Sequence, residues 1–378
     1  MKYLRMFLPI SIILLLTPSC YYLNQGAVLI SHRASSRGFD AALQRSAREH
    51  GEDSAEYRRL EEFFALTAEI SRYGREELGL NRDRNYSTYL EVENEYLVAV
   101  VNAAPPDSLE PYLWRYPFFG PAPYRGFYDP DDARDEALRL RNQGYDTWIR
   151  RVDGFSTLGI TRDPLISFMM DYSEYSLAQL IFHEQIHATL WVKRAVNFNE
   201  ELATALGQMA ALEYLADRYG ENSEVLIESR ARISDANQFA SDINALATQL
   251  NRVYGEYTAV FPELPPDEDL LKTKQSLIGD FQDSFAENYE DRYGSEAYRG
   301  FAELEINNAF ISLYQTYSGR GEDYRRLYNL AGSVSETIRL LKMALDNPQA
   351  YGSSYSRGDD PYQLVLDLIS WLQNRRAS

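Results

Sequence analysis

The second half of the sequence constrains the fold most, because beyond about residue 173 it is predicted to be helical almost throughout. Long helices are expected over 221–256, 268–289 and 321–347. The expected breaks are near Gly220, Pro262 to Pro266, Gly294, Gly319 to Gly321 and Tyr351 to Asp360. Strand patterns are confined to the first half, where they cover 89–101, 145–152 and 155–160. This order predicts the α+β class, in which a predominantly helical protein carries a small sheet in its first half.

The composition limits the classes of protein to which the chain can belong. A hydrophobic fraction of 45% and an aromatic fraction of 13% are typical of a globular chain with a substantial core. The 56 acidic residues outnumber the 38 Lys and Arg, which gives a formal net charge of −18. This balance argues against a nucleic-acid partner, since a polyanion needs a basic surface. A polytopic membrane protein is also excluded, because the only long apolar run is at the N-terminus.

The N-terminus has the pattern of a secretory signal. Lys2 and Arg5 precede an apolar run over Phe7–Leu16, which is about half of the roughly 20 residues that a membrane-spanning helix needs. Cys20 follows directly and is the only cysteine in the chain. We therefore predict a lipoprotein signal over residues 1–19 and a lipid on Cys20. The alternative is an ordinary signal peptide with an incidental thiol.

These features predict the compartment and the domain organisation. The protein is expected in the bacterial cell envelope, anchored by its lipid outside the cytoplasm. With a single cysteine no intramolecular disulfide can form, so burial must stabilise the fold. We predict one catalytic domain over 20–378, with a mixed helix and strand portion over 20–172 and a helical portion over 173–378.

Residues 183–187 read His-Glu-Gln-Ile-His, which is the HExxH pattern of zinc peptidases. They lie in a predicted helix over 175–192, with Ser173 or Ser176 available to cap its start. Side chains four positions apart share one face of a helix, so His183 and His187 can both bind one Zn²⁺. Glu184 is turned by about 100° around the helix axis. This direction suits a general base that reaches a metal-bound water better than it suits a third metal ligand.

A third ligand is expected from the next helix. Twelve residues after His187 the chain reads Asn199-Glu200-Glu201-Leu202-Ala203-Thr204. A carboxylate in the first turn of a neighbouring helix would complete a three-ligand catalytic site, and Glu200 is our candidate. Glu201 points about 100° away from it. The remaining histidines, His32 and His50, have no companion motif and are interpreted as polar residues of surface helices.

The chain resembles a bacterial family of predicted zinc aminopeptidases, many of which are lipoproteins. The resemblance extends over most of the mature chain. It is carried by Cys20-Tyr21-Tyr22 with Gln25-Gly26, Tyr86-Ser87-x-Tyr89, Ser108-Leu109-Glu110-Pro111, Tyr124-Arg125-Gly126, Gly144-Tyr145-Asp146, Ser156-Thr157-Leu158-Gly159, Asp163-Pro164, Phe182-His183-Glu184-x-x-His187, Phe198-Asn199-Glu200-x-x-Ala203-Thr204, Asn307-Asn308-Ala309 and Thr316-Tyr317. The family usually has Leu-Ala and then Gln where this chain has Gln185-Ile186 and Ala188, and often Ser-Phe in place of Glu201-Leu202. None of these departures removes a ligand or the base.

The resemblance implies a zincin-like metallopeptidase of the Glu-zincin type with one Zn²⁺. In such a site the metal lowers the pKa of a water, and Glu184 takes its proton and later delivers it to the leaving amine. The tetrahedral oxyanion needs a second donor, often Tyr or His in Glu-zincins. No histidine follows His187, so we expect Tyr317 in this role, with Tyr314 as the fallback.

The sequence leaves two alternative roles open for residues 155–159 and two for Arg125. Residues 155–159 are predicted either as the edge strand that pairs with substrate backbone or as an ordinary buried strand. Arg125 is predicted either to hold a substrate carboxylate or, preferably, to form a structural ion pair. The carboxylate for a substrate α-amine is not selected by any pattern, although Glu201 is near in sequence.

The function expected first is a membrane-anchored zinc aminopeptidase that hydrolyses N-terminal peptide bonds of peptide substrates. A zinc endopeptidase acting on envelope proteins is the second reading. The third is a catalytically silent lipoprotein that binds zinc. Structural zinc sites are typically closed, cysteine-rich sets of four ligands, and Cys20 is the only cysteine. That scarcity and the intact Glu184 weigh against the third reading.

Overall fold

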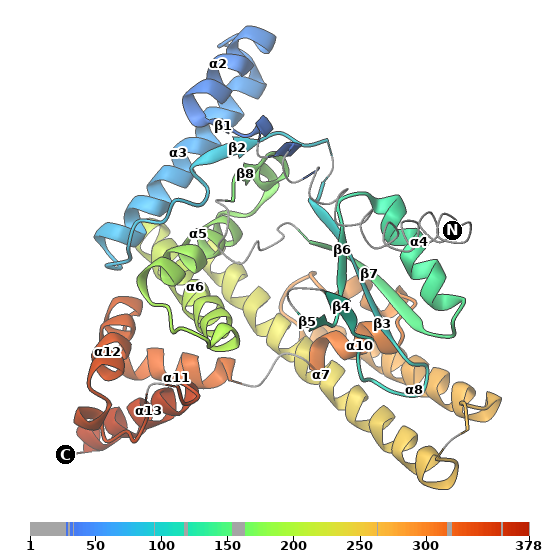
Figure 1. Cartoon of the computed structure of the whole chain (residues 1–378). Helices are drawn as coiled ribbons and strands as arrows, with labels where there is room; N and C mark the ends of the chain where they lie inside the picture. Colours follow the sequence, from blue (N-terminus) through green and yellow to red (C-terminus); the bar gives the residue numbers. More distant parts are fainter. Residues whose placement is uncertain are drawn as a thin grey trace, which may run out of the picture. The chain divides into compact units, whose positions relative to one another are not determined.

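The computed structural model describes residues 28, 31–32, 34–93, 95–116, 120–152, 163–262, 264–315, 320–356 and 358–377. It is predominantly helical with a few small sheets, which confirms the predicted α+β class (Figure 1). No described helix is long and apolar enough to cross a membrane.

The chain divides into two compact units. Unit 1 draws on three ranges, Met1–Ala42, Ser87–Phe168 and Asn307–Phe310. Unit 2 draws on Leu43–Tyr86, Met169–Ile306 and Ile311–Ser378. The single catalytic domain over 20–378 stays a prediction.

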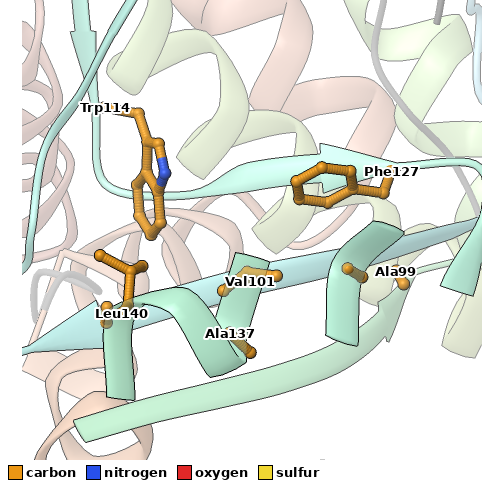
Figure 2. Close-up of a cluster of buried hydrophobic side chains, with 8 residues drawn as sticks. Ala99, Val101, Trp114, Phe127, Ala137 and Leu140 are labelled. Atoms are coloured by element: carbon orange, nitrogen blue, oxygen red, sulfur yellow. The ribbon is translucent and has the colours of Figure 1, made fainter. Parts of the chain in front are cut away.

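Unit 1 is built on strand β3 (Val98–Ala104), which is buried at all seven positions. It pairs antiparallel with β6 (Arg125–Phe127) on one side and with β7 (Asp146–Val152) on the other. Helix α4 (Pro130–Arg141) begins with Pro130 after the N-cap Asp129, whose side chain accepts from Asp131 N. In Figure 2 apolar residues of α4, β3, β4 and β6 form one cluster. Its labelled members are Ala99, Val101, Trp114, Phe127, Ala137 and Leu140.

The remaining strands of unit 1 are short. Strands β1 (Arg37–Gly38), β2 (Thr88–Leu90) and β8 (Leu165–Ile166) form a sheet in the order β1-β2-β8. Strands β4 (Trp114–Tyr116) and β5 (Gly120–Ala122) pair with each other. The predicted strand region 89–101 therefore contains most of β2 and the start of β3, and the chain that follows contains β4, β5 and β6. The predicted strand 155–160 lies outside the described residues.

Unit 2 holds most of the helices, including the predicted metal-binding helix. Its helices, with the two that lie partly in unit 1, are α2 (Phe39–His50), α3 (Ala55–Glu76), α5 (Glu174–Thr189), α6 (Val196–Tyr219), α7 (Glu224–Val260), α8 (Glu268–Glu287), α9 (Tyr289–Arg292), α10 (Asn308–Gln315), α11 (Gly321–Ala331), α12 (Val334–Asp346) and α13 (Tyr362–Ala377). Three short 3-10 turns are η1 (Ser167–Asp171), η2 (Arg299–Glu303) and η3 (Pro348–Tyr351). Helices α5 and α6 lie side by side over most of their lengths, and α3 packs against α5 (Figure 1).

One helix prediction is wrong. The sequence predicts a single helix over 321–347, whereas the structure has α11 and α12 with a break at Gly332. Gly332 has a left-handed φ of 94°, which ends α11. Ser333 then caps α12 by accepting from Glu336 N. A glycine followed by a capping serine outweighs the apolar periodicity that continues through both helices.

Candidate metal centre

Helix α5 is fixed by a cap and by a buried side. Ser173 is its N-cap, and its hydroxyl accepts from Ser176 N at 3.2 Å. The side chains that hold the helix in unit 2 are apolar and buried, namely Tyr175, Leu177, Ala178, Ile181, Phe182 and Ile186. The positions between them, 183, 184 and 187, are only partly buried. Local packing therefore leaves both histidines and Glu184 accessible.

The two histidines face each other. Their Nε2 atoms are 3.0 Å apart, and the ring centroids are 4.6 Å apart with the planes at 89°. The side chains are 20% and 15% exposed for His183 and His187. The four-residue spacing thus brings two nitrogen donors to one point, as predicted from helix geometry.

Glu200 completes the group from the second turn of α6, because the helix begins at Val196, earlier than the start at Asn199 that the sequence predicts. One carboxylate oxygen lies 3.4 Å from His183 Nε2 and the other lies 3.4 Å from His187 Nε2. The preceding residue, Asn199, is buried and holds the connection between the two helices. Its amide donates to Val192 O at 2.8 Å and accepts from Val192 N at 2.9 Å. This reciprocal pair fixes the point at which α6 begins, and with it the position of Glu200.

These three donors fit a tetrahedral metal ion. All lie within 4.8 Å of one another, and they are the only such group of His, Cys, Asp and Glu among the described residues. Zn²⁺ bonds of 2.0–2.1 Å at tetrahedral angles require donors to be about 3.3 Å apart. The observed separations of 3.0, 3.4 and 3.4 Å agree with that requirement. Two imidazoles and one carboxylate are also a donor set of catalytic zinc sites. The group can therefore hold a metal ion.

Close packing of the helix backbones supports this geometry. A Cβ added at Gly207 of α6 would lie 3.2 Å from Gln179 O and 3.3 Å from His183 N. The glycine lets α6 approach α5 this closely at the level of His183 without any shift of the α5 backbone. The helix that carries Glu200 is thus held near the helix that carries the histidines.

The two acidic residues of the site have opposite pKa shifts. Burial raises the pKa of Glu184, and the charge of Asp83 adds to this effect. The charges of His183 and His187 and a hydrogen bond from Asn85 act in the other direction without reversing the shift. Hydrogen bonds with His183 and His187 lower the pKa of Glu200 to about 2. The two carboxyl groups therefore differ in their affinity for a proton, since Glu200 keeps its negative charge to a lower pH than Glu184 does.

Glu201 faces a different set of partners. Tyr324 Oη lies 3.5 Å from its Oε2, and Arg320 Nη1 lies 3.9 Å from the same oxygen. Glu201 is therefore turned from the metal-binding group toward α11, as the helix geometry predicts.

The other residues singled out by sequence have varied positions. Tyr317, Cys20 and residues 155–159 lie outside the described residues. The fallback Tyr314 packs edge-on against Phe239, with ring centroids 5.4 Å apart. Arg125 Nη1 lies 3.4 Å from Glu136 Oε1, which is the ion-pair alternative.

The two remaining histidines do not belong to the metal-binding group. His32 packs edge-on against Tyr128, with ring centroids 5.3 Å apart. His50 is exposed at the end of α2.

Two neighbours of the site were not predicted from sequence. Asn85 donates from Nδ2 to Glu184 Oε2 at 2.8 Å. Asn85 directly precedes the motif Tyr86-Ser87-x-Tyr89. The sequence assigned no role to this motif, which was the only signal that could have pointed to Asn85. Trp191, which is 51% exposed, packs edge-on against His187 with ring centroids 5.1 Å apart.

Comparison with known proteins adds a family. No match was found among curated proteins or among solved structures. The sequence model of a family described as "Putative aminopeptidase" matches residues 39–348, which is most of the chain. The match includes α5 and the start of α6, and so all three side chains that could hold a metal ion. The chain belongs to this aminopeptidase family.

Proposed function

We propose that the protein is a zinc-dependent aminopeptidase. The observation that carries the proposal is the convergence of His183, His187 and Glu200, with Glu184 beside them on the same helix. Membership of the aminopeptidase family supports a peptidase, and the His, His and Glu donor set supports zinc as the metal.

One Zn²⁺ held by these three residues would polarise the scissile carbonyl and lower the pKa of water. Glu184 is the general base, which accepts a proton from the attacking water on a carboxylate oxygen. It then transfers this proton to the nitrogen of the leaving amine. The raised pKa of Glu184 suits this role, because it makes the carboxylate a stronger base toward the water and lets the carboxyl group hold the proton until the amine leaves. Tyr317 is our proposed hydroxyl donor to the oxyanion, with Tyr314 as the fallback.

Access to the site supports turnover rather than a closed structural role. The Glu200 side chain is 50% exposed, so the ligand group is open to solvent on one side. A structural zinc site is usually closed by a fourth protein ligand. Among the described residues no fourth His, Cys, Asp or Glu joins the group.

The test uses the full chain in detergent beside its Glu184→Gln variant. We expect one bound zinc in both proteins and a kcat that is lower by about 10²–10⁴-fold in the variant, because the amide cannot accept the proton. Offering free and N-acetylated forms of the same peptides separates the modes of attack. Cleavage confined to peptides with a free amine supports the aminopeptidase, and cleavage of both forms would indicate an endopeptidase. Zinc without turnover on a broad peptide panel would indicate a silent zinc-binding protein, and no zinc at all would overturn the metal site.

We further propose that a lipid on Cys20 anchors the protein to a membrane of the bacterial envelope, outside the cytoplasm. The motif Leu16-Thr17-Pro18-Ser19-Cys20 after a short apolar run supports this. Peptides are the proposed partners. The net charge of −18 argues against nucleic acid as another one.

A further inference from the structure

The segment between α3 and β2 runs back along the metal-binding helix. It leaves α3 through Gly79, which has a left-handed φ of 68°, and Leu80 N donates to Gly74 O at 2.8 Å. Asn81 then binds the end of α5 in two ways. Its backbone N donates to Thr189 Oγ1 at 2.7 Å and its side chain donates to Ala188 O at 2.9 Å. The segment is therefore attached to the last turn of α5.

A tight turn next directs Asn85 toward Glu184. The Asp83 carboxylate accepts from Arg84 N at 2.6 Å and from Asn85 N at 3.0 Å. This is the local pattern by which an aspartate side chain stabilises a turn. Tyr86, which follows, has a φ of 54°, an uncommon value for a residue with a side chain. Asn81 and Asn85 are four residues apart, as are their partners Ala188 and Glu184 on α5.

We propose that Asn85 is a positioning residue for the catalytic base. Its amide nitrogen donates to Glu184 Oε2 at 2.8 Å, and both side chains are partly buried. A carboxylate only accepts hydrogen bonds, so the NH₂ of the amide must face it. With Oε2 held by Asn85, the carboxylate plane is fixed and Oε1 stays available to accept the proton. The proposal rests on the proposed function, because Asn85 acts only through Glu184.

The contact has the features of an outer partner that orients a reactive group. Glu184 has a long side chain with several rotamers, and only some of them direct an oxygen toward the space between His183 and His187. Removing partners of this kind typically costs about 10–100-fold in activity or metal affinity. Asn85 is bonded to the base rather than to a ligand, so we expect the loss in kcat and not in zinc content.

The test compares Asn85→Ala and Asn85→Asp with Asn81→Ala in the full chain in detergent. Asn85→Ala removes the donor, and Asn85→Asp replaces it by an acceptor of the same size. Asn81→Ala is the matched control, since it removes a bond of the same segment to α5 without touching Glu184. We expect both Asn85 variants to lose roughly 10–100-fold in kcat, with KM and zinc content within about twofold of the wild type. Asn81→Ala should stay within about twofold in kcat.

A second measurement asks whether Asn85 acts through Glu184. Added to Glu184→Gln, the change Asn85→Ala should leave the residual kcat unchanged, because the base is already absent. Equal losses for Asn81→Ala and Asn85→Ala, or an undiminished effect of Asn85→Ala in the Glu184→Gln background, would overturn the positioning role. If Glu184→Gln leaves kcat unaltered, the proposed function is wrong, and the positioning role of Asn85 loses its basis with it. If Glu184→Gln loses activity while Asn85→Ala keeps full activity, only the positioning role of Asn85 is wrong.

Discussion

Within the segment His183–His187, the two histidines lie on the side of α5 that faces Glu200, whereas Gln185 and Ile186 lie on the side that packs on α3. Gln185 and Ile186 are each 1% exposed. Gln185 Nε2 donates to Ser71 O at 2.9 Å and to Ser71 Oγ at 3.2 Å. The family usually has Leu-Ala at these two positions, and here a buried glutamine matches a polar acceptor on α3. The two inner residues of the motif therefore hold the helix that presents the two outer ones.

The glutamine also requires a glycine opposite it. A Cβ at Gly74 would lie 2.0 Å from Gln185 Oε1 and 3.1 Å from Phe182 Cε1. Because the glutamine is buried and bonded to Ser71, it cannot turn away without losing those bonds. We expect Gly74→Ala to lower the free energy of unfolding by about 1–3 kcal/mol, as measured by urea denaturation. Gly279→Ala is the matched control. That helical glycine has no atom within 4 Å of an added Cβ, so the change should stabilise by about 0.5–1 kcal/mol.

Adjacent glutamates provide a second test at this scale. Glu200 lies between the two histidines, whereas Glu201 faces Tyr324 and Arg320. We expect Glu200→Gln to lose zinc during dialysis against a weak chelator, since it lacks the ligand charge. Glu201→Gln should keep the wild-type zinc content, measured by atomic absorption. Equal retention by both variants would remove Glu200 from the ligand set.

At the scale of elements, helix α4 is joined to its sheet by a buried carboxylate. Glu136 accepts from Trp114 Nε1 at 2.8 Å and from both Arg139 Nε and Nη2 at 2.8 and 2.9 Å. Arg125 lies 3.4 Å from the same side chain. Burial opposes the ionised form, but the hydrogen bonds from Arg139 and Trp114 and the two arginine charges outweigh it and lower the pKa of Glu136. Through Glu136, helix α4 is thus bonded to Trp114 of β4, a member of the apolar cluster, and to Arg125 of β6.

The lowered pKa of Glu136 makes the stability of the fold depend on pH, and the direction of this dependence follows from the direction of the shift. Because the pKa of Glu136 in the folded state lies below its ordinary value of 4.5, its stabilisation is complete above pH 4.5. It is lost as the pH falls through the folded-state pKa. We expect Glu136→Gln to cost about 1–3 kcal/mol at pH 7. The difference from wild type should shrink below pH 4.5, as followed by denaturation at several pH values. A difference that stays constant down to pH 2 would contradict this account.

Sequence patterns predicted the elements where one local signal dominates. Ser173, one of the two predicted caps, marks the start of α5, and the HExxH spacing alone places two nitrogens at one point. The contacts that depend on other segments could not be predicted. Asn85 reaches Glu184 from 99 positions away, and no periodicity links the two. Gly332 broke a predicted helix because a single left-handed residue outweighs the apolar repeat.

At the scale of the whole molecule, the lipid that we propose on Cys20 would determine where the protein works. Cys20→Ser removes the only thiol to which a lipid could be attached. We expect the wild-type chain to incorporate labelled fatty acid and to sediment with membranes. The variant should do neither, while peptide cleavage persists because residue 20 precedes the matched family range. A wild-type chain that remains in the soluble fraction without label would contradict the anchor.

Unit 1 is assembled from three separate stretches of chain, and this affects the order in which the protein can be made. Asn308, which is fully buried, donates to Pro105 O at 2.9 Å and to Ser108 O at 3.1 Å, and its own N donates to Asp146 at 3.0 Å. A growing polypeptide lacks these contacts until residue 308 has left the ribosome. A shortened product that ends before residue 308 would leave the carbonyls of Pro105 and Ser108 without this amide. Unit 1 therefore cannot be completed until its last segment, Asn307–Phe310, has been synthesised and has left the ribosome.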